Sequence, residues 1–332
     1  MTMTIENNST NGRVSRRSST ASASQRLRSN FAAVRVSFTW LGVRKSLNTE
    51  QKAQAAEPFG AEGQFLSAGK KLLDTKHEAF QAVSSVRSQI VSYWKGLSLP
   101  YPEPGMRLIK QDDIEPFNER MDQFREELTG AVDNLDQHFE SLKRAAQDRL
   151  GSLYNPTDYP NSLRGLFAVE WDFPSVEPPE YLLRLNPHLY QQERDRITAR
   201  FDEAVKLAEE AFVSEFARLV SHLSERLTSD VDGEKKIFRD SAINNLTEFF
   251  DRFKRLNVRS NGDLDRLVET AQRTLAGVDP HTVRNSASLR QHVTTELAAV
   301  QSVLDGMLVD QPRRRILRNG RNGDTTASEV RS

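Results

Sequence analysis

The chain contains two long ladders of apolar residues in which each step along the sequence is three or four residues. The first extends from Phe117 to Leu153 and the second from Ile197 to Leu227. This spacing places the apolar side chains of each ladder on one stripe of an α-helix, which has to be buried against another helix. At a rise of about 1.5 Å per residue, the two helices would be roughly 55 and 45 Å long. The ladders therefore predict a mainly α protein built from long helices.

The mean step of each ladder distinguishes straight helices from a coiled coil. Ten steps cover the 36 residues of the first ladder, a mean of 3.6, and eight cover the 30 residues of the second, a mean of 3.75. A left-handed coiled coil requires 3.5 residues per step. We therefore expect nearly straight helices in an antiparallel hairpin or bundle, in preference to a long two-stranded coiled coil.

Two segments far apart in the sequence carry the alternation that is typical of half-buried β-strands. Apolar residues occupy every second position from Val34 to Trp40 and again from Phe167 to Phe173, and a weaker strand is predicted at residues 106–110. An isolated pair of strands is only marginally stable in water. We therefore expect the first two strands to share a small sheet that helices cover, with a helical hairpin inserted between them. The fold class predicted is mainly α (α+β): a long antiparallel helical hairpin or bundle on a small β-containing base.

Capping residues and helix breakers give the limits of the helices. The prolines at 100, 102 and 104 end the helix that precedes them, and Asn186 followed by Pro187 is a typical helix start. Helices are predicted at residues 64–97, 113–153, 187–228, 235–256, 262–276 and 284–308.

The two ends of the chain differ from its middle in composition and charge. Residues 1–30 hold five Arg and one Glu, and residues 311–332 hold six Arg and two acidic residues, whereas the chain as a whole has no net charge. Both ends are poor in large apolar residues and are predicted to be disordered. The expected organisation is a disordered basic tail at 1–30, a long-helix domain rooted on strands at 31–230, a helical region at 231–310 and a disordered Arg-rich tail at 311–332.

Composition excludes several kinds of site. The chain has no cysteine, so disulfides, thiolate catalysis and cysteine-based metal sites are excluded. No apolar run approaches the 18 residues that a transmembrane helix needs, so no membrane span is expected. Without an apolar leader segment, a cytoplasmic location is expected.

No motif for catalysis, a cofactor or a metal ion emerges. The segment Gly63–Lys71 has five residues between its glycines, where a phosphate-binding loop needs four, and Lys71 stands where that loop has Ser or Thr. Ser67 and Lys70 have the spacing of a Ser–Lys pair but lack its partner motifs. Asp74, His77 and Glu78 would share a helix face, for which a solvated surface is the simpler interpretation. We therefore predict no catalytic, cofactor-binding or metal-ligating residue.

The three tryptophans, Trp40, Trp94 and Trp171, are the strongest candidates for specific contacts. Their positions on predicted strands and at the end of a predicted helix suggest anchors between helices and sheet. The alternative is that they bind a partner, because Trp is enriched at protein interfaces.

The segment Trp40-Leu-Gly42-Val-Arg44-Lys45-Ser-Leu47 and the later Gly69-Lys70-Lys71 give the chain a resemblance to a family of uncharacterised bacterial, phage and plasmid proteins. The resemblance covers roughly residues 34–230. That family has no established activity. Its members resemble accessory proteins that are sometimes encoded near AAA+ ATPases, so the resemblance implies a protein partner, such as an ATPase of that kind.

The function expected from the sequence is therefore that of a non-enzymatic interaction, assembly or accessory protein acting through long helix faces, with a protein partner or a second copy of the chain. One alternative is a nucleic-acid-associated factor that binds through its Arg-rich tails. The other is an enzyme whose site is assembled only in three dimensions.

Overall fold

The computed structural model describes residues 21–228, 241–278, 282 and 286–309. The chain is mainly α with a small antiparallel sheet, which confirms the predicted fold class. It divides into two compact units: residues 1–209 with 252–260, and residues 210–251 with 261–332. Among the described residues, no helix is long and apolar enough to cross a membrane. The division at residue 230 that the sequence suggests stays a prediction.

The sheet of the first unit has the strand order β4-β5-β1-β6. Strand β1 (Phe31–Trp40) pairs antiparallel with β6 (Phe167–Asp172), so that Trp40 lies opposite Phe167. The first half of β1 pairs with β5 (Met106–Lys110), which in turn pairs with β4 (Ser98–Pro100). The predicted pairing of two strands more than 120 residues apart is confirmed, and so is the weaker third strand.

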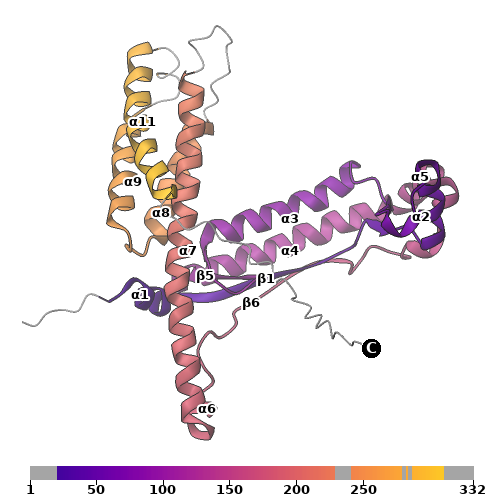
Figure 1. Cartoon of the computed structure of the whole chain (residues 1–332), viewed down its shortest axis with the longest axis horizontal. Helices are drawn as coiled ribbons and strands as arrows, with labels where there is room; N and C mark the ends of the chain where they lie inside the picture. The colour runs from indigo at the N-terminus through magenta and orange to yellow at the C-terminus, as the bar shows by residue number, and fades with distance from the viewer. Residues whose placement is uncertain (1–20, 229–240, 279–281, 283–285, 310–332) are drawn as a thin grey trace, which may run out of the picture. The chain divides into compact units, whose positions relative to one another are not determined.

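One face of this sheet is covered by an antiparallel helical hairpin, α3 (Glu78–Leu97) and α4 (Ile114–Gln137), which lie side by side in Figure 1. Ring contacts at both ends establish the direction of the two helices: Tyr93 stacks on Phe117 at 5.9 Å, and His77 lies 5.3 Å from His138. The buried ladder residues of α4 lie between α3, α4 and the sheet. They are Phe117, Met121, Phe124, Leu128, Val132 and Leu135.

The first ladder is not one rod. Helix α4 ends at Gln137, and α5 (Phe139–Leu150) begins after His138, whose N–H bonds to the carbonyl of Leu135 at 3.1 Å instead of continuing the α-helical pattern. The prediction of a single helix over residues 113–153 is therefore wrong. Because a one-residue break leaves the apolar spacing in phase, Phe139 and Leu142 are buried as the pattern requires, and the spacing does not reveal the break.

The helix predicted at 64–97 is also wrong over its first part, because α3 begins only at Glu78. Residues Gly63–Phe65 form a short 3-10 turn (η2), and Gly69–Lys71 form a strand, β3. The imidazole of His77 caps α3, its Nδ1 accepting the N–H of Ala79 at 3.3 Å. Leu66 and Leu73 therefore share the apolar spacing of Phe80 on α3, although neither lies in a helix.

The N-terminal segment differs from its prediction as well. Residues Ala23–Asn30 form a helix, α1, which Ser22 and Gln25 begin with a reciprocal capping box. Leu27 on α1 is fully buried, and the Arg26 guanidinium donates two hydrogen bonds to the carbonyl of Val258, at 3.1 and 2.6 Å. The prediction that residues 1–30 are disordered is therefore wrong for residues 23–30. The predictions for residues 1–20 and 311–332 lie outside the described residues.

The second ladder lies on α7 (Pro187–Thr228), which begins at the predicted Asn-Pro start. The Asn186 side chain accepts the N–H of Leu189 at 3.0 Å, as expected of a capping residue. In the first unit, Phe201 of α7 meets Tyr101 edge to face at 5.8 Å. A five-residue helix, α6 (Tyr181–Leu185), precedes α7.

The second unit consists of the remainder of α7, α8 (Ser241–Leu256) up to Asp251, α9 (Gly262–Leu275) and α11 (Ala287–Val309). Its core includes a stack of Phe216 on Phe249 with ring centroids 5.1 Å apart. The helices predicted at 262–276 and 284–308 are confirmed within the described residues. The turn predicted at Asp232-Gly233 lies outside them.

Candidate functional site

The three tryptophans lie in the first unit, as packing residues between the sheet and α3 or α4. Trp40 contacts Phe167 edge to face at 4.9 Å, and the Arg87 guanidinium lies 4.7 Å from its ring. Trp171 donates its Nε1–H to Asn118 Oδ1 at 2.8 Å. Trp94 is buried at 9% exposure. These contacts account for all three as anchors, and partner binding by them stays a prediction.

The polar residues of the sequence motifs lie in different surroundings and do not form one common site. Lys70 of the Gly63–Lys71 segment is buried on strand β3, while Ser67 is exposed in the loop before it. Asp74 forms an ion pair with Arg149 at 2.8 Å. Within the described part of the chain, no three His, Asp or Glu side chains gather as a metal site would require.

A site that the sequence does not predict lies just before the start of α3. Residues 43–72 form an excursion that we call the β2–β3 module, closed by pairing of β2 (Arg44–Ser46) with β3 (Gly69–Lys71). Two further backbone bonds close it, from Leu47 N–H to Ala68 at 3.1 Å and from Leu72 N–H to Val43 at 2.8 Å.

Inside the module, helix α2 (Thr49–Ala56) packs against the 3-10 turn η2. A Cβ on Gly63 would lie 2.7 Å from the backbone nitrogen of Ala53, so only glycine permits this close approach. The module is therefore a folded element and not a loose loop.

One face of the β2–β3 ribbon carries an ion cluster that is buried at Lys70 and Asp158 and half exposed at Lys45. Lys45 and Lys70 lie directly opposite each other on the two strands, and the carboxylate of Asp158 lies between their ammonium groups. Lys70 Nζ is 2.6 Å from Asp158 Oδ2 and also donates to the carbonyl of Leu153. The side chains of Lys70 and Asp158 are only 6% and 2% exposed. Like charges on opposite strands repel each other, so the carboxylate stabilises the ribbon by separating the two cations.

The two lysines also act on the acid–base equilibrium of Asp158. Hydrogen bonds from Lys45 and then Lys70 hold the pKa of this carboxyl below its ordinary value, against the opposing effect of burial. Asp158 is therefore ionised at neutral pH. At that pH the ion cluster acts as a clamp that holds the module to residues 151–158.

The other face of the ribbon repeats the arrangement of cations without the carboxylate. Arg44 lies directly opposite Lys71, and Ser46 lies directly opposite Gly69. All four residues are exposed, and among the described residues no carboxylate forms an ion pair with Arg44 or Lys71. A depression of about 380 Å³ lies here. Its lining is Arg44, Lys45, Ser46, Ser67, Ala68, Gly69 and Lys71.

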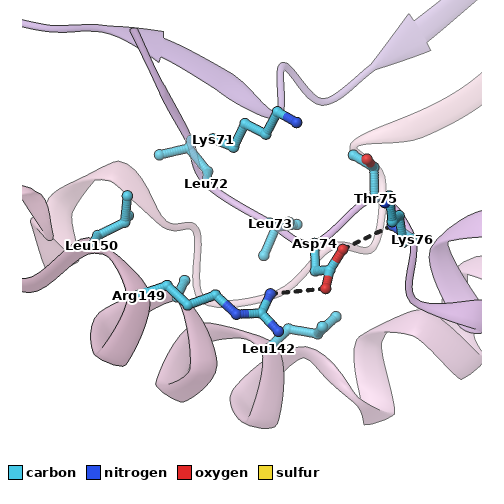
Figure 2. A pocket seen from close by; sticks show the side chains of 10 residues that line it. Lys71, Leu72, Leu73, Asp74, Thr75, Lys76, Leu142, Arg149 and Leu150 are labelled. Atoms are coloured by element: carbon cyan, nitrogen blue, oxygen red, sulfur yellow. Dashed lines mark hydrogen bonds and ion pairs between the residues drawn. The ribbon is translucent and has the colours of Figure 1, made fainter.

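A second pocket adjoins the first at Lys71, which lines both (Figure 2). Its volume is about 290 Å³, and it lies between residues 71–76 and helix α5. The apolar part of its wall consists of Leu72, Leu73, Leu142, Ala146 and Leu150. Figure 2 shows Asp74 turned toward Arg149, whose hydrogen bond lowers the pKa of that carboxyl, while Lys71 points away from this pair.

Two phenylalanines of the module project into solvent. Phe59 ends the 3-10 turn Glu57–Phe59 (η1) and is 83% exposed, and Phe65 ends η2 and is 82% exposed. Gly60, at φ +60°, takes the left-handed conformation that ends η1 and directs the chain toward η2. Exposed apolar side chains that gather on one surface are typical of interaction sites, and both of these rings belong to the same module.

The module therefore offers two cations, two hydroxyl groups, an apolar pocket and two exposed aromatic rings. Arg and Lys side chains with hydroxyl groups bind carboxylate or phosphoryl oxygens. The available signal in the sequence was the pair of dipeptides Arg44-Lys45 and Lys70-Lys71. Nothing in their spacing shows that they face each other across a ribbon. No protein-family model, curated protein or solved structure matches the chain.

Proposed function

We propose that the protein is a non-enzymatic interaction or assembly protein and that the β2–β3 module is a surface through which it binds a protein partner. The observation that supports this proposal best is the exposure of Phe59 and Phe65 on two ordered turns of one small module. Aromatic side chains are enriched at the centres of protein interfaces, where their burial contributes much of the binding free energy. The long helices α3 and α4 support the proposal because Val43 and Leu72, at the two ends of the module, pack into the core that these helices share.

The double substitution Phe59→Asp with Phe65→Asp is expected to abolish partner binding while leaving the fold intact. Since both rings are exposed, the free energy of unfolding should change by less than about 0.5 kcal/mol. The measurement is quantitative cross-linking mass spectrometry on the tagged full-length protein in its native cells, with light scattering to detect a second copy of the chain. Cross-links from the module in the wild type should disappear in the variant.

The matched control is Leu185→Asp with Val303→Asp, which places the same charges at two other exposed apolar positions. Its cross-links from the module should equal those of the wild type. Cross-links that survive the phenylalanine substitutions, or a wild-type protein that forms none and remains monomeric, would contradict the proposed function.

A further inference from the structure

We infer that Arg44 and Lys71 bind the carboxylates of an acidic segment of a protein partner, and that the pocket beside Lys71 holds an apolar side chain of the same segment. This inference rests on the proposed function, because it specifies the chemistry of the partner at the module.

The first step compares the two faces of the ribbon. Both faces carry two cations directly opposite each other, Lys45 with Lys70 and Arg44 with Lys71. On the inner face, the Asp158 carboxylate lies between the ammonium groups and offsets their repulsion. On the outer face, the described residues supply no such anion. The inner face thus shows that a carboxylate fits between paired cations of this ribbon. On the outer face, a ligand could supply the corresponding carboxylate.

The second step is access. Arg44 and Lys71 are exposed, so a ligand reaches them without any change of the fold. Gly69 lies two residues before Lys71 and opposite Ser46, and it lines the depression of about 380 Å³ without adding a side chain to it. Ser46 and Ser67 line the same depression, and a serine hydroxyl group can donate a hydrogen bond to a carboxylate.

The third step identifies the ligand as an acidic protein segment and not a nucleic acid. Non-specific nucleic-acid binding uses a track of cations along successive phosphates. Among the described residues of the module, Arg44, Lys52 and Lys71 form no ion pair, and only Arg44 and Lys71 face each other on the ribbon. The module also carries Glu50, Glu57 and Glu62, which disfavour a long run of phosphates. The adjoining pocket is walled by leucines and suits an aliphatic side chain. Since Lys71 lines both pockets, a carboxylate and a nearby apolar group would be recognised together.

The test uses isothermal titration calorimetry on the full-length protein with an acetylated, amidated hexapeptide in which Glu-Glu-Leu is repeated. A second hexapeptide has Gln in place of every Glu, and a twelve-nucleotide single-stranded RNA is a third probe. The double variant Arg44→Gln with Lys71→Gln is compared with Arg184→Gln with Lys254→Gln, which removes one Arg and one Lys from exposed positions elsewhere. The two variants have the same net charge.

The acidic peptide is expected to bind the wild type and the control variant equally and the ribbon variant about tenfold more weakly, roughly the sum of two exposed ion pairs. The glutamine peptide should bind all three proteins as weakly as the acidic peptide binds the ribbon variant. Because the variant removes repulsion between opposite cations, its melting temperature should equal or exceed that of the wild type.

Equal weakening in both variants, equal binding of the two peptides, or no binding to the wild type would overturn the inference. Tighter binding of the RNA that depends on Arg44 and Lys71 would overturn it in favour of a nucleic-acid site. Failure of the peptide test alongside cross-links that depend on Phe59 and Phe65 would leave the proposed function standing. Peptide binding that depends on the ribbon, without any such cross-links, would support the ligand chemistry and contradict only the proposed function.

Discussion

Asp158→Asn is expected to lower the free energy of unfolding of the first unit by about 3 kcal/mol. The substitution preserves the size of the side chain but removes the charge that lies between Lys45 and Lys70. Lys45 remains half exposed and regains water, whereas the ammonium group of Lys70 is 6% exposed and is left as a buried charge without a counterion. Among the described residues, its one other hydrogen-bond acceptor is the carbonyl of Leu153.

Tryptophan fluorescence during urea denaturation measures this effect in the right part of the molecule. All three tryptophans of the chain belong to the first unit, so their emission reports its unfolding and not that of the second unit. The matched control is Asp172→Asn, which removes the carboxylate of an exposed cross-strand pair with Arg35. Because this pair is exposed to solvent, its loss should cost much less stability than the loss of the Asp158 carboxylate. Equal losses in the two variants would contradict the view that Asp158 is a buried clamp.

The same clamp predicts how the stability of the first unit depends on pH. Lys45 and Lys70 hold the pKa of Asp158 in the folded protein below its ordinary value of about 3.9. The stabilisation from the clamp is therefore complete above the pKa of the unfolded chain and is lost as the pH falls through the lower pKa of the folded state. The difference between wild type and Asp158→Asn should be constant from pH 7 to pH 5 and shrink below about pH 4. Urea denaturation at a series of pH values measures it, and a difference that grows on acidification would contradict this assignment.

The elements that could be predicted from sequence are those whose own residues repeat with a period. Val34, Val36 and Phe38 alternate along β1, and the steps of the second ladder follow α7, so each segment indicates its own structure and its buried face. The pairing of β1 with β6 followed because two strands with one apolar face each need a common cover. In each case the apolar residues that repeat along the segment are the residues that become buried when the chain folds.

The candidate site lacked such a signal for physical reasons. Strands β2 and β3 have three residues each, too few to show an alternation. The burial of Lys70 depends on Asp158, which is 88 positions away, and the exposure of Lys71 depends on which face of the ribbon it occupies. A lysine that is buried and a lysine that is exposed are therefore neighbours in the sequence with nothing local to distinguish them.

Helix α1 shows the limit of composition as a guide to disorder. Residues 23–30 contain two Arg, two Ser and a Gln around a single Leu, which resembles a solvated tail. Yet Leu27 is fully buried, and Arg26 holds the helix to the carbonyl of Val258, more than 230 residues away in the chain. One apolar side chain is enough when the rest of the fold supplies the pocket for it.

Leu27→Ala is therefore expected to destabilise the first unit by about 3 kcal/mol, because it removes buried methyl groups and leaves a cavity that the surrounding residues fill only in part. Tryptophan fluorescence during urea denaturation measures the loss. Arg28→Ala is the control on the same helix: it breaks an ion pair with Glu177 in which both side chains are partly exposed, and should cost less than about 1 kcal/mol. If the two substitutions had equally small effects, residues 23–30 would behave as the disordered tail that their composition suggests. A large effect of Leu27→Ala alone would establish that the folded core begins at α1.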